Sequence, residues 1–288
     1  MAKCQNPDCG LAWLDPEPLE EDIHKAYQNY YTHNVDGYSK SVGRRLRSAG
    51  FQLVLKVSTF LCGLSKQKNN LERMHLDKAP LGRLLDIGCG GGAFLNKMKA
   101  SGWTVEGLDF DSEAVRAAIE TYGVQARVGS LEEIGYASES FDAITMHHVI
   151  EHVYHPVTLL REIRRILKPG GRLIVVTPNS NSWGHEWFGE NWRGLEPPRH
   201  VRLFNSRALA RTAAAAGFQK IHVYSTAANA WNLIAFSIAL ANAAKMNRFL
   251  EPVGPFIKLR ALAMQFREAW LNLDNHDLGE ECVLVART

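Results

Sequence analysis

Asp86-Ile87-Gly88-Cys89-Gly90-Gly91-Gly92 is the part of the sequence that says most about the architecture. The apolar pair Leu84-Leu85 precedes it and predicts a buried strand, and a helical pattern from Ala93 to Ala100 follows it. Glycines at such a strand-to-helix turn permit a tight backbone and let main-chain amides approach a ligand at the helix N-terminus. We therefore expect a strand, a glycine-rich binding loop and a helix, although a glycine turn that binds nothing is the simpler alternative.

Outside this unit, short apolar runs continue to alternate with amphipathic stretches as far as Gly217. Asp111 is a typical N-cap for one of the intervening helices, and Gly123 suits the left-handed position after its end. Alternation of this kind predicts an α/β fold, a parallel sheet with helices on both faces. Further strands are expected at Trp103–Leu108, Val124–Val128, Phe141–His147, Leu173–Val176 and Phe218–Tyr224, and helices at His155–Leu167 and Ser206–Ala216.

Two regions fall outside this alternation, so the chain divides into four parts. Residues 1–80 form a leader, and residues 81–226 form the α/β core. Residues 227–279 form a mostly helical insertion, which could be a lid, a dimer face or a groove for a lipid acceptor. Residues 280–288 hold a β-rich run that we interpret as the last strand of the sheet.

The leader contains an expected helix at Arg44–Leu64. Basic residues (Arg44, Arg45, Arg47) lie on one side of it and an apolar stripe on the other. A basic amphipathic helix can lie on an anionic membrane. More often such a stripe covers the core of its own domain, so we expect an N-terminal helical cap over the ligand site.

Composition and charge exclude several classes of protein. The net charge of +3 is too small to indicate a nucleic-acid partner. No stretch reaches the roughly 18 uncharged apolar residues that a membrane span needs, and the start of the chain lacks the pattern of a signal peptide. The five cysteines are odd in number and scattered, which suits a reducing compartment. We therefore expect a soluble cytoplasmic protein.

The glycine loop alone leaves the ligand ambiguous. Gly88-x-Gly90-x-x-Ala93 also satisfies a dinucleotide-binding fingerprint. Asp109 ends the second expected strand, where several nucleoside cofactors would offer a ribose diol to a carboxylate. Asp86 stands two positions before the first glycine, where nicotinamide-binding folds usually carry an apolar residue. This acid favours a cofactor other than a dinucleotide.

Two further segments complete a recognisable set. They are Phe141-Asp142-Ala143-Ile144-Thr145-Met146-His147-His148-Val149-Ile150-Glu151-His152-Val153 and Leu167-Lys168-Pro169-Gly170-Gly171-Arg172-Leu173-Ile174-Val175. Together with Leu84–Leu95 they resemble the class I S-adenosylmethionine-dependent methyltransferases, in particular the ubiquinone-biosynthesis O-methyltransferases and bacterial sugar and O-antigen-cluster methyltransferases. The resemblance covers roughly residues 80–225 and is specific as a set.

The resemblance implies a Rossmann-like sheet of seven strands in the order 3-2-1-4-5-7-6, with the last strand antiparallel and the helical insertion directly before it. It also implies S-adenosyl-L-methionine as cofactor and S-adenosyl-L-homocysteine as product. Asp86, Gly88, Gly90 and Gly92 would line the methionine and ribose part of the cofactor. The remaining contacts would be Asp109 to the ribose hydroxyls, Phe110 and Leu131 on the two faces of the adenine, Ser130 near the adenine amine, and His147 beside the sulfonium.

Methyl transfer from a sulfonium is a direct displacement, so the protein mainly aligns the reactants and excludes water. A hydroxyl or acidic carbon acceptor also needs a base. Ligands in this fold lie beyond the carboxyl ends of the strands. We expect the base among His148, His152 and His200, although His148 could instead shape the pocket wall and His152 could bond only the backbone.

The stretch 179–205 is the most informative part for the acceptor. It contains Trp183, Trp187, Trp192, Arg199 and His200, and loops of this length are usually functional or disordered. We interpret it as a lid over a flat or sugar-like acceptor, with Arg199 pairing a phosphate or carboxylate. The alternative is that the tryptophans only pack the loop against the sheet.

Cys4-x4-Cys9 resembles the second half of a zinc-ribbon leader found in some sugar C-methyltransferases. The first cysteine pair is absent, so we expect no metal and interpret the leader as a truncated module.

The sequence therefore predicts an enzyme that methylates a small-molecule, saccharide or lipid-linked acceptor at oxygen or carbon. Peripheral membrane contact and a homodimer are further possibilities. A cofactor-binding partner protein without catalysis, or a nicotinamide-dependent oxidoreductase, is the alternative.

Overall fold

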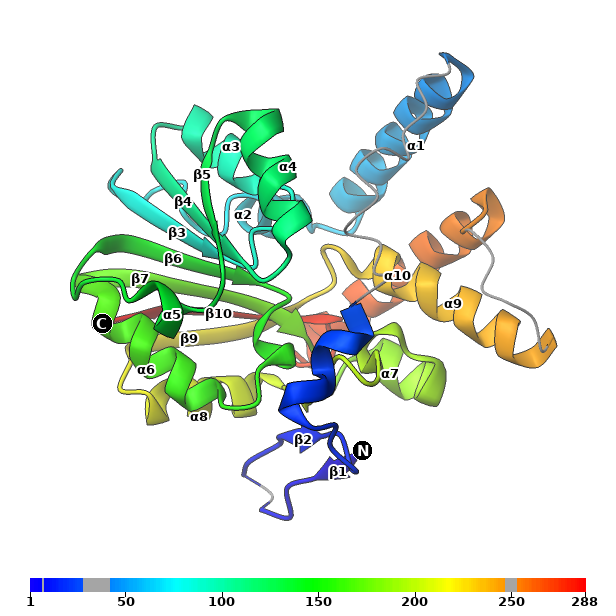
Figure 1. Ribbon diagram of the computed structural model, residues 1–288. Coiled ribbons are helices and arrows are strands. Elements are labelled where there is room, and N and C mark those ends of the chain that lie inside the picture. Colours follow the sequence, from blue (N-terminus) through cyan, green and yellow to red (C-terminus); the bar gives the residue numbers. More distant parts are fainter. Residues whose placement is uncertain (7, 28–41, 247–252) are drawn as a thin grey trace.

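The structure is a computed structural model that describes the whole chain except residues 7, 28–41 and 247–252. Its centre is a sheet of seven strands in the order β5-β4-β3-β6-β7-β10-β9 (Figure 1). In chain order this is 3-2-1-4-5-7-6, and β10 runs antiparallel to both neighbours, so the predicted topology is confirmed. The strands are β3 (Arg83–Ile87), β4 (Thr104–Asp109), β5 (Gln125–Val128), β6 (Phe141–His147), β7 (Leu167–Pro178), β9 (Gln219–Thr226) and β10 (Glu281–Arg287).

Helices cover both faces of this sheet (Figure 1). Alternate residues of a strand point to opposite faces, so Leu84 and Leu85 of β3 belong to two separate hydrophobic clusters. The cluster of Leu84 includes side chains of α2 (Ser65–Glu72), α3 (Ala93–Ala100) and α4 (Ser112–Tyr122). The cluster of Leu85 includes side chains of α5 (Leu131–Ile134), α6 (Pro156–Ile166) and α8 (Ser206–Ala215). The predicted layers are therefore confirmed.

Local signals set the helix ends close to where they are expected. The side chain of Asp111 accepts hydrogen bonds from the amides of Glu113 and Ala114, and Gly123 ends α4 at φ +59°. The region after α6 differs from the expectation, because β7 begins at Leu167 and contains the Pro-Gly-Gly turn instead of following it. The strand pairing with β6 shifts register across that turn. The Pro-Gly-Gly turn therefore lies inside one long strand, at the register shift, although its sequence is typical of a helix end.

The leader is joined to the core by a small second sheet. Its strands β1 (Ala2–Lys3) and β2 (Ala12–Trp13) pair antiparallel, and β2 also pairs with β8 (Arg202–Leu203) of the long loop after β7. A 3-10 helix, η1 (Glu20–Tyr27), follows.

The expected helical cap takes a different form from the prediction. The helix α1 (Val42–Leu61) projects from the body and does not cover the sheet (Figure 1). Leu53 is 63% exposed and Phe60 is 74% exposed, so the apolar stripe does not cover the core of its own domain. Leu55 and Thr59 are buried, so they lie on the side of α1 that faces the body. Side chains at 42–49, including the predicted basic residues, lie outside the described ones.

The insertion between β9 and β10 is helical, as predicted. It consists of α9 (Ala230–Met246) and α10 (Pro255–Asp274), which pack against each other around a third hydrophobic cluster. Because β9 ends and β10 begins at the edge where the parallel strands end, the two helices stand beyond the carboxyl ends of the strands. None of the helices in the described ranges is long and apolar enough to cross a membrane.

Candidate active site

The glycine loop after β3 is tightly packed on one side and open on the other. Gly88 has φ +74°, and a Cβ there would lie 2.3 Å from Cγ2 of Val149. Gly92 has φ +78°, and its Cβ would lie 2.7 Å from the Cβ of Ala118. A Cβ on Gly90 or Gly91 would instead meet no atom within 4 Å. Glycine is thus required at the packed positions, while the middle of the loop leaves room for a ligand to approach its backbone.

Asp109 holds the open part of the loop. At the end of β4, its Oδ2 accepts a hydrogen bond of 2.8 Å from the amide of Gly90, and its Oδ1 accepts one of 2.9 Å from the amide of Asp111. The next residue, Phe110, is 77% exposed. An exposed aromatic ring beside a fixed carboxylate can stack on a planar base whose sugar the carboxylate binds.

Two other residues predicted to contact the adenine are placed differently. Leu131 is only 2% exposed and belongs to the hydrophobic core, so little of its side chain can meet a ligand. The hydroxyl of Ser130 accepts from the amide of Glu133, and the carboxylate of Glu133 accepts from the amide of Ser130. Ser130 therefore serves as the N-cap of α5.

Asp86 lies at the base of the loop. It is 5% exposed, and the hydroxyl of Thr145 on β6 donates a hydrogen bond of 2.6 Å to its Oδ1. Burial raises the pKa of Asp86 to about 7, the hydrogen bond from Thr145 opposes this rise, and the charge of Asp109 adds to it. A cationic ligand group would hold this carboxylate in its ionised form at neutral pH.

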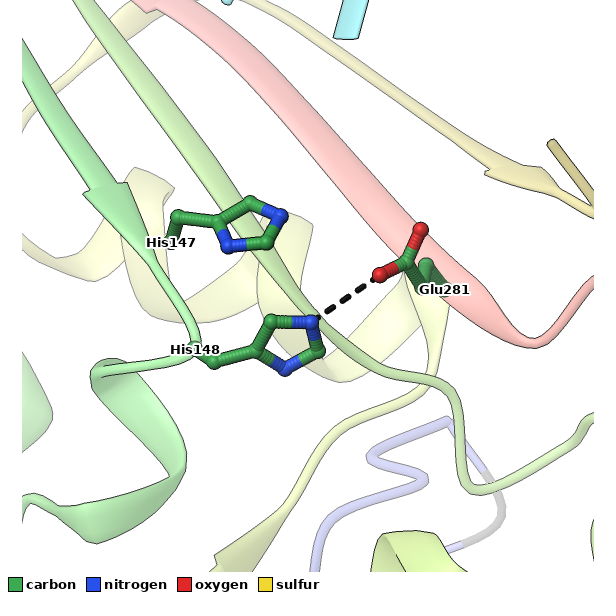
Figure 2. Close-up of side chains that lie close together, drawn as sticks. All are labelled: His147, His148 and Glu281. Atoms are coloured by element: carbon green, nitrogen blue, oxygen red, sulfur yellow. Dashed lines mark hydrogen bonds and ion pairs between the residues drawn. The ribbon is translucent and has the colours of Figure 1, made fainter. Parts of the chain in front are cut away.

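His148 lies between two carboxylates just after β6, and Figure 2 shows one of them, Glu281. Its Nδ1 is 3.1 Å from Oε1 of Glu151, in the 3-10 helix η3 (Ile150–His152), and its Nε2 is 2.9 Å from Oε1 of Glu281, the first residue of β10. His148 has φ +56°, a left-handed conformation that is uncommon for any residue but glycine. The turn at the end of β6 therefore places the ring between the carboxylates at the cost of backbone strain.

The two carboxylates make His148 an imidazolium. Burial alone would lower its pKa, but the hydrogen bonds and charges of Glu151 and Glu281 outweigh burial and raise the pKa to about 10. Burial conversely favours protonated carboxyl groups, yet the bond to His148 lowers the pKa of Glu151 to about 2 and also lowers that of Glu281. Thr177 donates a further hydrogen bond of 2.9 Å to Glu151. At neutral pH one imidazolium between two carboxylates leaves one net negative charge.

His147 is the neutral partner of this cluster. Its ring packs edge-on against that of His148, with 4.5 Å between the ring centroids (Figure 2). The side chain keeps an exposed face, but protein surrounds the rest of the ring. This burial, together with the positive charge of His148, lowers the pKa of His147 to about 4. At neutral pH its ring therefore keeps a nitrogen lone pair that can accept a hydrogen bond.

His152 and His200 hold the long loop against η3. The Nδ1 of His152 is 3.0 Å from the carbonyl oxygen of Arg199, and the Nδ1 of His200 is 2.7 Å from that of Gly194. His200 is 4% exposed, and burial lowers its pKa to about 4. The two rings pack 4.7 Å apart. Both predicted base candidates thus make backbone contacts that fix the loop.

Two groups of side chains in the described part of the chain lie close enough to share a metal ion. One is His147, His148 and Glu281, and the other is Glu151, His152 and His200. In the first group the carboxylates already occupy both ring nitrogens of His148. Neither group includes Cys4 or Cys9.

The long loop is ordered by its tryptophans. Trp192 is 1% exposed, donates a hydrogen bond of 2.7 Å to Glu280 and stacks on the ring of His185. Trp183 is also buried, so the alternative that the tryptophans pack the loop is confirmed for these two, and Trp187 alone of the three is exposed. The guanidinium of Arg199 donates to Glu196, so it is engaged within the loop. The loop helices are α7 (Trp183–Phe188), η4 (Gly189–Asn191) and η5 (Arg193–Leu195).

Glu281 was missed by the sequence reasoning. It lies 130 positions after Glu151, and nothing in the local pattern marks it as a site residue. The signal that could have found it is topological. An antiparallel last strand begins at the edge where the parallel strands end, so the acid that opens the strand faces His148.

An open sheet covered on both faces, with a glycine loop after its first strand and an acid at the end of its second, defines the Rossmann-like class of α/β proteins. Residues 63–223 match a family model described as a methyltransferase domain, which is more than half of the chain. The chain belongs to this methyltransferase-domain family.

Similar proteins agree with the family. A ubiquinone biosynthesis O-methyltransferase of Xanthomonas oryzae pv. oryzae is 38% identical over 104 residues, which cover 34% of this chain and 43% of that protein. The protein of the same name from Xanthomonas axonopodis pv. citri is 38% identical over 169 residues, covering 56% and 67%. The chain thus spans less than half the length of the first of these relatives and two thirds of the second.

Solved structures share the fold. Phosphoethanolamine N-methyltransferase 2 of Haemonchus contortus, in complex with S-adenosyl-L-methionine, has a TM-score of 0.52 at 20% identity, covering 76% of this chain and 52% of that one. The [4+2]-cyclase SpnF has a TM-score of 0.53 at 22% identity, covering 76% and 80%. Because a cyclase shares the fold, the fold by itself does not establish the reaction.

Proposed function

We propose that the protein transfers a methyl group from S-adenosylmethionine to a small-molecule acceptor and releases S-adenosylhomocysteine. The observation that carries this proposal is the open middle of the glycine loop, whose Gly90 amide is fixed by Asp109 beside the exposed ring of Phe110. The family of the chain and the methyltransferase names of its relatives support it.

The chain's own residues fit this cofactor. Asp86 and the backbone of Gly88, Gly90 and Gly92 would hold the methionine and ribose part. Asp109 would bind the ribose hydroxyls and Phe110 would stack on the adenine, with smaller contributions from Ser130 and Leu131. When bound, the cofactor supplies an activated methyl group on a sulfonium. The net negative charge of the cluster formed by His148, Glu151 and Glu281 favours a cation nearby.

The residue proposed to contact the acceptor hydroxyl is His147, in place of the base candidates His148, His152 and His200. His148 has both ring nitrogens engaged and a pKa raised to about 10, so it has no free lone pair at neutral pH. His147 has an exposed face and a neutral ring. It can accept a hydrogen bond from an acceptor hydroxyl and orient the oxygen for displacement. His148 would fix the position and neutral state of His147.

The acceptor is proposed to be small and to carry its nucleophile on oxygen or carbon, with saccharides and lipid-linked precursors as the classes to test first. Arg199 is engaged by Glu196, so recognition of an acceptor phosphate is not assigned to it. We also propose a cytoplasmic location, which the five free cysteines support. The division into a leader (1–80), a core (81–226), an insertion (227–279) and a last strand (280–288) is part of the same proposal.

Calorimetric titration with S-adenosylmethionine, S-adenosylhomocysteine and NADH tests the cofactor. We expect both sulfur compounds to bind and NADH not to bind. Asp109→Ala should weaken the binding by about 10-fold or more, because it removes charge-assisted hydrogen bonds. Glu120→Ala, which removes an exposed carboxylate on α4, is the matched control and should leave the affinity unchanged.

Two outcomes would contradict the proposal. Binding of NADH alone would indicate an oxidoreductase, and binding of none of the three compounds would leave a methyltransferase fold with another use. Cofactor binding without methyl transfer to any acceptor in a panel of phenols, sugars and lipid precursors would favour a non-catalytic partner protein.

A further inference from the structure

The helix α10 has apolar side chains on both its inward and its outward side. The inward side buries Ala261, Leu262 and Ala269 together with the polar side chains of Gln265, Glu268 and Asn272. Its outward side exposes large apolar side chains that recur at helical spacing. They are Phe256 (87% exposed), Leu259 (63%), Phe266 (46%), Trp270 (63%) and Leu273 (67%).

The inward polar side chains are bound to backbone groups, so this orientation is fixed. Gln265 donates to the carbonyl oxygens of Ala227 and Ala228 at 2.7 and 3.1 Å. Glu268 accepts from the amide of Glu280 at 2.7 Å, and the Oδ1 of Asn272 accepts from the amides of Leu278 and Gly279. A rotation of α10 that hid its aromatic side would leave these groups without their partners at a large cost.

The described part of α1 repeats this pattern. Its exposed side chains include Leu53, Val54, Val57, Phe60 and Leu61, and Leu55 on its inward side is also apolar. A helix that exposes an apolar stripe to water normally has a partner surface that covers the stripe.

The helices α1 and α10 contact each other on the inward side of α1. The ammonium of Lys258 on α10 lies 5.0 Å from the ring centroid of Phe51 on α1. At the other end, the guanidinium of Arg267 lies 5.3 Å from the ring of Trp183 and 5.6 Å from that of Trp187, an exposed residue of α7. Both helices extend beyond the sheet on the same side of the molecule (Figure 1). Exposed large apolar side chains therefore occur together on α1, α7 and α10, beyond the scattered exposure of single residues that is normal for a protein surface.

The charges on this surface identify what covers it. From residue 50 of α1 and along α10, the exposed charged side chains are Lys56, Arg260, Arg267 and, at the end of α10, Asp274. Glu268, the other acid of α10, is fully buried. A second copy docked by the same face would bring together two surfaces that each carry a net positive charge, which is unfavourable. Apolar side chains with a basic fringe complement an anionic lipid surface.

We propose that the apolar faces of α1 and α10 form a docking surface for an anionic lipid bilayer. The helices would lie in the interface with their aromatic and aliphatic side chains among the acyl chains and the basic residues at the phosphates. This docking goes beyond the proposed methyl transfer and does not depend on it. Because the insertion stands beyond the carboxyl ends of the strands, the bilayer would lie on the same side of the molecule as His147.

Vesicle cosedimentation of the full chain tests the proposal. The probes are vesicles of phosphatidylcholine alone and of phosphatidylcholine with phosphatidylglycerol. We expect binding to the anionic vesicles that weakens with added salt, and weaker binding to the neutral ones. The double variant F266Q/W270Q should bind the anionic vesicles about 10-fold or more weakly, since it removes two exposed apolar anchors. The variant R260Q/R267Q should lose the preference for anionic vesicles.

Controls separate docking from folding and from the cofactor site. I119Q/L81Q removes exposed apolar residues elsewhere on the molecule and should sediment like the unmodified chain. A second double variant on α1, V57Q/F60Q, should repeat the loss if the α10 variant proves unstable. Affinity for S-adenosylmethionine, measured by calorimetry, should be the same in all variants, so that failure of docking is distinguishable from failure of the proposed function.

Two results would overturn the proposal. One is that the unmodified chain stays in the supernatant with both kinds of vesicle. The other is a stable dimer in sedimentation velocity that F266Q/W270Q converts to a monomer without any vesicle binding, which would assign the surface to a second copy.

Discussion

Two adjacent histidines, His147 at the end of β6 and His148 directly after it, have opposite charge states. Glu151 and Glu281 keep His148 charged, while burial and the charge of His148 keep His147 neutral. The sequence shows only a His-His pair after an apolar run. The two rings differ because only His148 lies between the carboxylates of Glu151 and Glu281. Glu281 is far from His148 in the sequence, so the sequence pattern does not show this contact.

Titration of the histidine rings by NMR checks these charge states without an acceptor. We expect His148 to stay an imidazolium up to about pH 9 and His147 to stay neutral down to about pH 5, since their pKa values are about 10 and about 4. Glu281→Gln should lower the pKa of His148, because it removes one of two negative partners. The single variants His147→Gln and His148→Gln assign the signals. A His148 signal that titrates near pH 6.5 in the unmodified chain would contradict the account.

The raised pKa of His148 makes the stability of the folded state depend on pH. The pKa of His148 rises from 6.5 to about 10 on folding. Its protonation therefore stabilises the folded state fully below pH 6.5, and this contribution is lost as the pH rises through 10.

Asp86 in its ionised form destabilises the folded state, whereas the charged form of His148 stabilises it. Its pKa rises on folding from 3.8 to about 7, so ionising it costs folding free energy as the pH rises through that range. Asp86→Asn should therefore raise the free energy of unfolding at pH 8, on the order of 2–4 kcal/mol, while it weakens cofactor binding. Chemical denaturation measured at pH 5 and pH 8 checks this.

Asp142→Asn is the matched control for that experiment. Asp142 pairs with Lys168, and although burial acts against it, this pairing lowers the pKa of Asp142. Its ionisation therefore supports folding, and the variant should be slightly less stable than the unmodified chain at pH 8. If Asp86→Asn were also less stable than the unmodified chain at pH 8, the prediction would be wrong and the carboxylate would be needed for the fold.

At the scale of elements, the local signals predicted the helices and strands of the core and the helical insertion, but not the side that α1 exposes. The N-cap at Asp111 and the glycine at 123 predicted α4 to within a residue, because capping depends only on neighbours in the chain. The face that α1 presents could not be predicted in the same way. An apolar stripe indicates that a helix packs against an apolar partner, but it does not indicate whether that partner lies in the same molecule.

The glycine loop provides a test at this scale. Gly88→Ala would place a Cβ 2.3 Å from Val149 at a positive φ, so we expect it to lower the free energy of unfolding by about 2 kcal/mol or more. Gly91→Ala adds the same methyl group where no atom lies within 4 Å, at a residue without a positive φ, and should change stability little. It should nevertheless weaken cofactor binding if the open side of the loop is where the ligand lies. Equal stability of the two variants would contradict the packing described for Gly88.

At the scale of the whole molecule, sequence reasoning predicted the order of all seven strands and the place of the insertion. This was possible because the motifs after the first and fourth strands are local and characteristic as a set. The cluster around His148 depends on the antiparallel return of β10, and the small sheet that joins the leader to the core depends on contacts nearly 190 positions apart in the chain. Contacts of this kind carry no local signal.

A crystal structure with S-adenosylhomocysteine bound would show whether the glycine loop is the cofactor site. We predict the ribose hydroxyls on the carboxylate of Asp109, the adenine against Phe110, and the amino acid part along the loop from Gly88 to Gly92 toward Asp86. A ligand bound elsewhere, or a glycine loop closed over the space beside Gly90, would contradict it.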